Sequence, residues 1–469
     1  MEPSIRLASL ALMTISSLLW RSADAAPPRV ISMQPDHGDI NVDPAITHIR
    51  VTFDQDMSPN GRSICGGGST FPELSGQPVW ESPRVIAIPV KLKPGAVYSM
   101  SMNCPAGQNF RSASGEPAES SPLSFRTAPD GVAPAPARVL TPEENLAAID
   151  AAREAVNDAY SYRDRVVKDW DALFESHRAA LEASPSPAAF AREAGRMLAA
   201  SQDPHVRLVV NDASFGSVHR SFTPNFDGQK IGPTVPGLRR LNDIVLAGVI
   251  EPESTAPIGY ILIASWPGDP ELLRHAHEEL TAMISRGFSR IIIDVRPNGG
   301  GDELTARAFA SRFTQGRAVY SRNRIRDAAS PNGWTRPFER AVQPFAEESI
   351  DNPKAAALGP ADANPLFRGR IAVLQGPSCL SSNESFLLMM RHGAAAMLFG
   401  APSGGSSGNP KPHDLGNGVT LLLPSWEDME PDGSVIEGRG IEPHEAATFD
   451  PRAQRDTVIE AAVRWLKDH

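Results

Sequence analysis

The sequence has few features of a nucleic-acid-binding or membrane-spanning protein. Acidic residues outnumber basic residues by 55 to 45, the formal net charge is -10, and no cluster of lysine and arginine interrupts this balance. A protein without a basic field does not attract a polyanion, so we predict that the chain does not bind nucleic acid. Beyond the N-terminus, no segment has the roughly 18 to 20 consecutive apolar residues that cross a bilayer. We therefore expect no stable membrane span in the mature protein.

Cysteine is also scarce, with three residues in the whole chain. Cys65 and Cys104 would pair as a disulfide in an oxidising compartment, and two unpaired thiols are the alternative. Cys379 has no neighbouring cation in the sequence to stabilise a thiolate, which argues against a cysteine nucleophile. The stretch His275-Ala276-His277-Glu278 lacks the two-histidine zinc spacing, and we expect it to be a solvated helix face. We predict no metal and no cofactor.

The N-terminus has the pattern of an export signal. Arg6 precedes an apolar run over residues 7–20, and Ala23-Asp24-Ala25 is the small-x-small pattern that signal peptidase cleaves. We predict that residues 1–25 are a signal peptide and that the mature protein is periplasmic or secreted. An uncleaved N-terminal anchor is the alternative, although the apolar run is short for a span.

The length predicts two or three domains, because single cores stop growing at roughly 250 to 300 residues. Residues 27–128 contain short β-branched or alternating runs between Pro, Gly, Asp and Asn clusters, which predicts a small β-sandwich. The runs at residues 35–57 and 123–127 resemble bacterial Ig-like domains, and this resemblance implies an accessory role without chemistry of its own.

An Ala/Pro-rich segment, residues 129–140, is predicted to be a semi-rigid linker. Thr141-Pro142-Glu143-Glu144 and Ser186-Pro187 then supply helix start signals, so residues 141–205 are expected to form a helical subdomain. Residues 206–469 alternate apolar strands with helical segments, which is typical of an α/β core with a mixed sheet. The fold class is therefore multidomain.

Four segments place glycine, hydroxyl or titratable residues at predicted strand or helix ends, where α/β proteins tend to build sites. Their sequences are Asp203-Pro204-His205, Asp294-Val295-Arg296-Pro297-Asn298-Gly299-Gly300-Gly301, Ser381-Ser382-Asn383-Glu384 and Glu437-Gly438-Arg439-Gly440-Ile441-Glu442-Pro443. Together they resemble the tail-specific (C-terminal-processing) serine peptidase family, which includes the tricorn core and interphotoreceptor retinoid-binding proteins. The likeness spans about residues 190–447 and implies a core of the ClpP/crotonase-like type and a peptide or protein substrate.

By this resemblance Ser381 is the nucleophile, at the start of an apolar helix whose N-terminus favours an oxyanion. The alternative is that Ser381 and Glu384 form an ordinary capping box. One branch of the family has a lysine 25 residues after its serine, but this position is Ser406 here. Lys411 is close by, in what we expect to be an exposed turn, where a protonated amine is a poor base.

The tricorn-like branch pairs its serine with an earlier histidine and a late glutamate, and His205 and Glu437 match these positions. The alternatives are a loop histidine that bonds Asp203 or the backbone, and a turn carboxylate. A neutral imidazole can take the serine proton near pH 7. The resemblance also implies that the N–H groups of Gly300 and Ser382 form the oxyanion hole. Further candidate accessory residues are Asn298, Glu384 and Ser406.

The predicted function is that of an exported serine-type peptidase acting through an acyl-enzyme. Only about 45 residues separate Val210 from Pro257, too few for the PDZ domain that captures substrate C-termini in processing members of the family. Two alternatives stay open: an inactive relative that binds an apolar ligand or peptide, and an envelope interaction protein that acts through residues 27–128. The sequence does not determine the oligomeric state, and a homo-oligomer stays among the alternatives.

Overall fold

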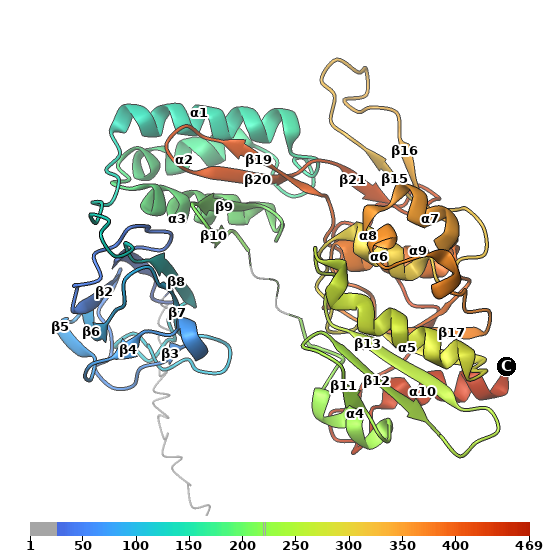
Figure 1. Cartoon of the computed structure of the whole chain (residues 1–469). Helices are drawn as coiled ribbons and strands as arrows, with labels where there is room; N and C mark the ends of the chain where they lie inside the picture. Colours follow the sequence, from blue (N-terminus) through green and yellow to red (C-terminus); the bar gives the residue numbers. More distant parts are fainter. Residues whose placement is uncertain (1–25, 219, 221) are drawn as a thin grey trace, which may run out of the picture. The chain divides into compact units, whose positions relative to one another are not determined.

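The structure is a computed structural model that describes residues 26–469 except 219 and 221, so the predicted signal peptide lies outside the described residues. The chain divides into two compact units between Ala137 and Arg138 (Figure 1). None of the described helices has the length and hydrophobicity of a membrane span.

The N-terminal unit contains two antiparallel sheets around one hydrophobic core. One sheet has the order β1-β2-β6-β4 with β5 beside β6, and the other has the order β3-β7-β8. The bounds are β1 Val30–Gln34, β2 His48–Phe53, β3 Ile64–Cys65, β4 Glu73–Leu74, β5 Val79–Ser82, β6 Val85–Lys91, β7 Val97–Met102 and β8 Ser121–Arg126.

Alternation along the strands builds this core. In β2, Ile49, Val51 and Phe53 are buried while the residues between them are at least partly exposed, as the period-2 geometry of a half-buried strand requires. Cys65 and Cys104 form a disulfide with their Cα atoms 6.2 Å apart, which confirms the predicted pairing.

The second unit begins with three helices, α1 (Pro142–Ala159), α2 (Trp170–Glu182) and α3 (Pro187–Leu198). The predicted start signals are confirmed, because Thr141 and Glu144 form a reciprocal capping box and the Ser186 hydroxyl caps α3. The helices pack on an antiparallel sheet of order β10-β9-β20-β19, and the two layers share one hydrophobic cluster. The strands are β9 Arg207–Val210, β10 Ala213–Gly216, β19 Pro410–Asp414 and β20 Thr420–Pro424.

The largest sheet has seven strands in the order β11-β12-β13-β14-β17-β18-β22, parallel from β13 to β22. The strands are β11 Arg239–Arg240, β12 Val245–Ile250, β13 Ile258–Ile263, β14 Arg290–Asp294, β17 Arg370–Gln375, β18 Met397–Gly400 and β22 Glu445–Ala446. Both faces of this sheet are buried. Ile291 and Ile293 of β14 join one hydrophobic cluster, and Ile292 joins another on the opposite face. Such two-sided burial explains why these strands are continuous apolar runs.

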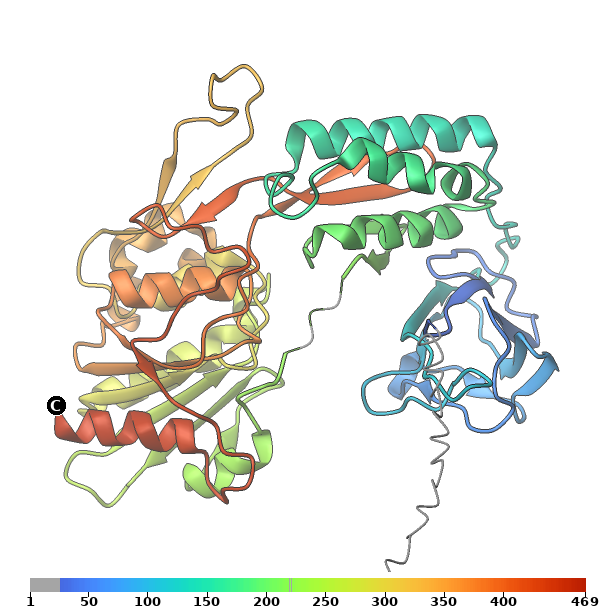
Figure 2. The same cartoon turned by 180° about the vertical axis from the view of Figure 1, so that it is seen from behind.

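Helices cover both faces, as Figures 1 and 2 show. One cluster contains residues of α5 (Arg274–Ser285), α6 (Glu303–Ala310) and α9 (Ser382–His392), and the other contains residues of α4 (Gly228–Thr234) and α10 (Thr457–Asp468). The remaining elements are a small antiparallel sheet and short helices. Their bounds are β15 Ala318–Arg324, β16 Phe338–Val342, β21 Glu427–Met429, α7 Phe345–Asp351, α8 Pro353–Ala357 and the 3-10 turns η1 Gly68–Thr70, η2 Ala199–Ser201, η3 Pro270–Leu273 and η4 Ala361–Ala363.

The expectation of a solvated face at His275 and His277 is wrong for the second histidine. His275 is exposed, but the His277 ring is buried against Phe309 and Phe345, and its Nδ1 accepts a hydrogen bond from Arg312. Burial, and then the Arg312 charge, lowers the pKa of His277 well below its usual value. His277 is therefore a neutral core residue.

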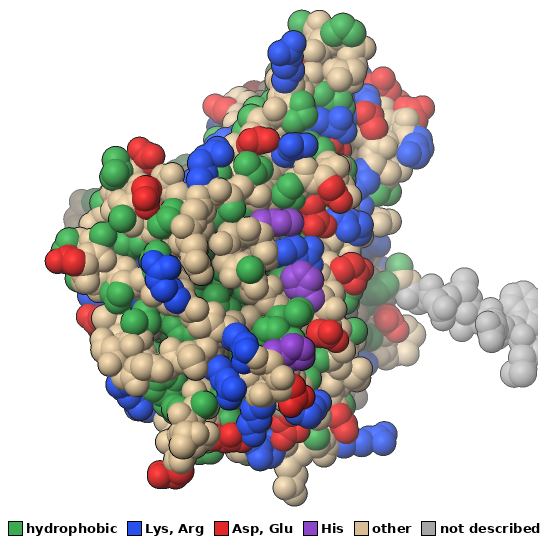
Figure 3. All heavy atoms as spheres, turned by 90° about the vertical axis from the view of Figure 1, so that its right-hand side faces the viewer, with side chains coloured by type: hydrophobic (Ala, Val, Ile, Leu, Met, Phe, Trp, Pro, Cys, Tyr) green, Lys and Arg blue, Asp and Glu red, His purple; other side chains and the backbone are tan. Residues whose placement is uncertain are grey.

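Charged side chains are mixed on the surface. On the face drawn in Figure 3, basic and acidic side chains are interspersed and form no large patch of one sign.

Candidate active site

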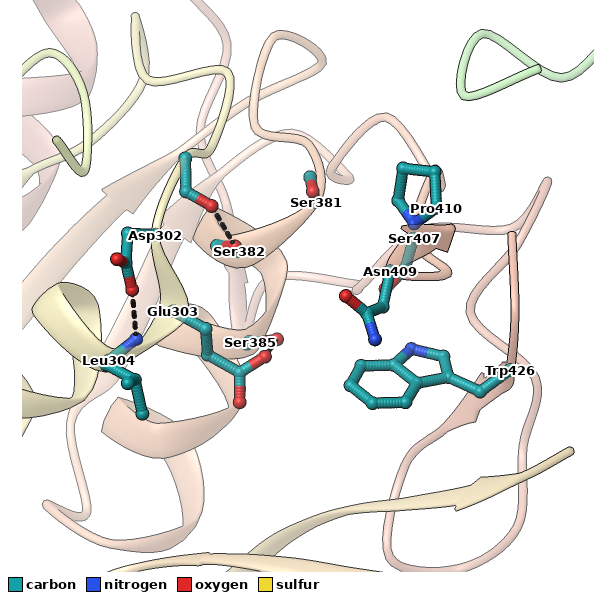
Figure 4. A pocket seen from close by; sticks show the side chains of 11 residues that line it. Asp302, Glu303, Leu304, Ser381, Ser382, Ser385, Ser407, Asn409, Pro410 and Trp426 are labelled. Carbon is teal, nitrogen blue, oxygen red and sulfur yellow. Dashed lines mark hydrogen bonds between the residues drawn. The ribbon is translucent and has the colours of Figure 1, made fainter. Parts of the chain in front are cut away.

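Ser381 occupies a strained backbone position between β17 and α9. Its φ of 56° and ψ of -130° are those of the first central residue of a type II′ turn, a position that normally requires glycine. Such a conformation costs a non-glycine residue about 1–3 kcal/mol and is concentrated at functional sites. The Ser381 hydroxyl makes no hydrogen bond with any described residue, and the side chain faces a cavity (Figure 4).

The structure excludes the capping-box role for Ser381 and Glu384. Ser381 is the residue before α9, but its side chain caps no N–H. Glu384 points elsewhere: its carboxylate accepts hydrogen bonds from the Ser403 hydroxyl and from the N–H groups of Gly405 and Ser406. Burial raises the pKa of Glu384 to about 7, although these hydrogen bonds oppose the shift.

Two buried carboxylates hold the loop 403–407, which connects β18 to β19. Glu384 binds the N–H groups of Gly405 and Ser406, and Glu437 accepts the next N–H, that of Ser407, at 3.0 Å. Gly405 has a φ of +65°, and a Cβ there would lie 2.6 Å from the backbone nitrogen of Gly440. Glycine is therefore required for this loop to approach the 437–441 segment so closely.

Ser406 connects His205 to the turn that carries Ser381. Its hydroxyl lies 2.8 Å from Nδ1 of His205, and its carbonyl accepts the Ser381 N–H at 2.7 Å. Ser406 thus contacts both the candidate base and the turn of the candidate nucleophile. Ser406 itself is fully buried.

His205 is mostly buried, with 14 % of its side chain exposed. Burial lowers the pKa of His205 below 6.5, the charges of Arg207 and Arg220 lower it further, and Asp203 opposes them. The imidazole is consequently neutral near pH 7, the form that can accept a proton. The structure places no hydrogen bond between His205 and Ser381.

Glu437 is in a turn, but its side chain is buried and does not lie on the surface. Its buried carboxylate is 2.7 Å from a guanidinium nitrogen of Arg220. Burial and the charge of Asp203 raise the pKa of Glu437 to about 8, against the attraction of Arg220. The Asp203 carboxylate in turn accepts hydrogen bonds from the Tyr160 hydroxyl and from the backbone N–H of His205.

Asp203, His205 and Glu437 are the one group among the described residues with spacing suited to a metal, with ligand atoms within 4.8 Å of one another. Arg220 places a fixed positive charge against this group, at 2.7 Å from Glu437. The arrangement fits an ionic network around a histidine better than a cation site.

The glycine turn differs from expectation at Gly300. Its N–H, the expected oxyanion donor, instead donates to the Asn298 side chain at 2.8 Å. Among described residues, the N–H groups of Gly301 and Ser382 have no hydrogen-bond partner, and both residues line the cavity. The turn still requires glycine, since a Cβ on Gly300 would lie 2.9 Å from the Ser381 Cβ.

The Asp-x-Arg part of the same motif has a structural function. The buried guanidinium of Arg296 lies 2.6 Å from Asp294 and 2.9 Å from Asp456, which precedes α10. The side-chain amide of Asn298 donates to the backbone carbonyl of Ile263, and the backbone carbonyl of Asn298 accepts a hydrogen bond from the side-chain amide of Asn383. These contacts fix the end of β14 relative to β13, α9 and α10.

Two other candidates lie away from the chemistry. Lys411 is exposed on β19, and Cys379 is buried. Burial raises the pKa of Cys379 to about 12, which keeps it a thiol.

Several residues of the site carry no signal in the sequence. Arg220 binds the carbonyls of Gly404 and Gly405 as well as Glu437, but no motif surrounds it. The hydroxyl of Ser407 donates to Asp428 on β21. These contacts join residues far apart in the chain, and only the folded structure reveals them.

Comparisons with known proteins give one family match and several similar structures. Residues 257–447 match the model of peptidase family S41. A Parabacteroides merdae protein described as a candidate peptidase superposes with a TM-score of 0.55 at 20% identity, over 70% of this chain and 97% of the other.

Two further structures resemble the chain less closely. The photosystem II D1 C-terminal processing protease has a TM-score of 0.40 at 14% identity, over 69% of this chain and 97% of the other. The tricorn protease has a TM-score of 0.42 at 12% identity, over 90% of this chain and 46% of the other. No curated protein sequence matches the chain.

Proposed function

We propose that this chain, whose residues 257–447 match the model of peptidase family S41, is a serine-type peptidase that hydrolyses peptide bonds through an acyl-enzyme on Ser381. The observation that carries the proposal is the strained Ser381, whose hydroxyl is unpaired among the described residues and faces a cavity. Ser406 links it to the neutral His205, because the Ser406 carbonyl accepts the Ser381 N–H and the Ser406 hydroxyl contacts the His205 ring.

In the proposed reaction the Ser381 Oγ attacks the substrate carbonyl while its proton passes to His205 Nε2. His205 then gives that proton to the leaving amine, and the C–N bond breaks to leave an ester on Ser381. Water, deprotonated by the same imidazole, hydrolyses the ester and returns the serine. Catalytic hydrogen bonds are often open without substrate and close in the Michaelis complex, which fits the absent Ser381–His205 contact.

Ser406 is proposed to orient His205. When Nδ1–H donates to the Ser406 hydroxyl, Nε2 keeps the lone pair that accepts the serine proton. Glu384 and Glu437 support this arrangement by holding the loop that carries Ser406. Neither carboxylate contacts the His205 ring through a hydrogen bond.

We propose the N–H groups of Ser382 and Gly301 as oxyanion donors in place of the pair that the sequence suggested. Both are unpaired among the described residues and both line the cavity that Ser381 faces. Each such donor typically contributes roughly 3 to 4 kcal/mol to transition-state stabilisation.

The rest of the chain suggests an exported enzyme with an accessory domain. The Cys65–Cys104 disulfide supports a periplasmic or secreted location after removal of residues 1–25. Two antiparallel sheets with one core support an Ig-like sandwich for 27–128, and the helix-covered mixed sheet supports a ClpP/crotonase-like core.

One observation favours a competing function, ligand binding without turnover. The Ser381 hydroxyl and His205 are not hydrogen-bonded in the structure. Turnover separates the two functions, because a binder with this site would retain ligands without cleaving them.

The test is cleavage of unfolded casein and of a quenched-fluorescent peptide library by the mature protein. Wild type is expected to cleave, and Ser381→Ala is expected to lose activity. Ser378→Ala, in the same loop between β17 and α9, is the matched control and should keep the activity. Cleavage that persists in Ser381→Ala would contradict the proposal, and folded wild type that cleaves nothing would favour the binding function.

A further inference from the structure

The cavity beside Ser381 has an acidic wall. It has a volume of about 390 Å³, and Ser381, Ser382, Asp302, Glu303 and Trp426 are among the residues that line it (Figure 4). The lining contains two carboxylates and, among the described residues, no lysine, arginine or histidine. A cavity next to both the nucleophile and the oxyanion donors would receive the side chain of the residue whose carbonyl is attacked.

The Glu303 carboxylate is held in a fixed orientation. Glu303 is the first residue of α6, its side chain is 22 % exposed, and Figure 4 shows it pointing toward the cavity. The Tyr320 hydroxyl donates to one carboxylate oxygen, and Arg340 and the Ser385 hydroxyl donate to the other. An acid so held is preorganised and does not need to reorient when a ligand arrives.

The neighbouring cations do not neutralise this wall. Arg340 also binds both oxygens of the buried Asp428 at 2.9 Å, so one guanidinium serves two carboxylates. Asp302 has Lys354 at 3.6 Å, and both side chains are 27 % exposed, so solvent screens that pair. The cavity therefore keeps a net negative charge.

The opposite wall is aromatic. Trp426 lies across the cavity from Glu303 in Figure 4, and the guanidinium of Arg340 already lies over its ring, 4.9 Å from the centroid, so this wall is one against which the protein itself places a cation. An apolar side chain in this cavity would remove water from Glu303 without providing a partner, and an acidic side chain would be repelled.

We infer that this cavity binds the cationic side chain of a lysine or arginine residue, and that the enzyme cleaves peptides after such residues. This inference rests on the proposed peptidase function and adds its substrate class. Glu303 is the specificity-determining residue, and Asp302 contributes to the negative charge at the cavity.

The first experiment measures kcat/KM for matched peptides that differ only in arginine, lysine, leucine or glutamate before the scissile bond. Arginine and lysine are expected to exceed leucine by about tenfold or more, as for one charge-assisted hydrogen-bonded pair. Glu303→Gln should reduce that ratio about tenfold, while Asp302→Asn should reduce it less. A preference for leucine, or a ratio unchanged in Glu303→Gln, would overturn the inference.

A second measurement does not depend on catalysis, because Glu303→Gln also removes a partner of Arg340 and could disturb folding. Benzamidine and its neutral analogue benzamide are titrated into Ser381→Ala by calorimetry. Benzamidine is expected to bind about tenfold tighter or more, and Asp302→Asn in this background should weaken it. Equal binding of the two would overturn the inference. Selective benzamidine binding with no turnover by wild type would support the cavity assignment and refute only the peptidase function.

Discussion

The backbone strain at Ser381 predicts that replacing this serine with glycine will stabilise the protein while inactivating it. The φ of 56° and ψ of -130° suit glycine and cost serine about 1–3 kcal/mol. Glycine also adds conformational freedom to the unfolded chain, which offsets about 0.4–1 kcal/mol. No hydrogen bond is lost, because the Ser381 hydroxyl has no partner among the described residues. Ser381→Gly should therefore raise the free energy of unfolding by about 1 kcal/mol.

Urea unfolding followed by tryptophan fluorescence measures this change, since five of the tryptophans lie in residues 138–469. Ser381→Ala keeps the strain and should unfold like wild type. Ser378 lies in the same loop between β17 and α9 with a negative φ, so Ser378→Gly should lower the free energy of unfolding by about 0.4–1 kcal/mol. Ser381→Gly that is no more stable than Ser381→Ala would refute the argument that strain is stored at the nucleophile.

Three further predictions concern the loop and the base. The pKa of Glu384 is about 7 in the folded state against an ordinary 4.5, so the folded protein binds this proton more tightly than the unfolded chain does. The resulting stabilisation, about 3 kcal/mol, is present below pH 4.5 and should be lost as the pH rises through 7. Glu384→Gln should remove that slope from unfolding curves measured between pH 4 and 8, whereas Glu253→Gln on an exposed loop should retain it. Because burial lowers the pKa of His205, kcat/KM should rise with pH to a plateau with a midpoint below 6.5, and a midpoint above 7 would argue against His205 as the base. Ser406→Ala should lower kcat on the order of 10- to 100-fold with KM little changed, because the imidazole loses its orienting contact; an unchanged kcat would remove Ser406 from the mechanism.

Local patterns predicted the elements of the fold well. The capping signals at Thr141 and Ser186 start helices, and the apolar run at 290–294 is a strand buried on both faces. Such features depend on residues close in sequence, so periodicity and capping chemistry are sufficient to identify them.

Features that depend on distant contacts were not predictable in the same way. Ser406 and His205 are 201 residues apart, and only the meeting of loop 403–407 with the segment before β9 joins them. The residues around His277 predict an exposed helix face, but packing against Phe309 buries its ring. One local contact was also missed: the Gly300 N–H donates to Asn298, two residues away, and the glycine pattern alone does not specify this.

The central claim, an activated Ser381 with His205 as its base, is tested most directly by labelling the mature protein with a fluorophosphonate and mapping the adduct by mass spectrometry. We predict modification at Ser381 in wild type and in Ser378→Ala, and its loss in Ser381→Ala and in His205→Ala. Labelling at another serine, or labelling of Ser381 that is equally fast in His205→Ala, would contradict the account.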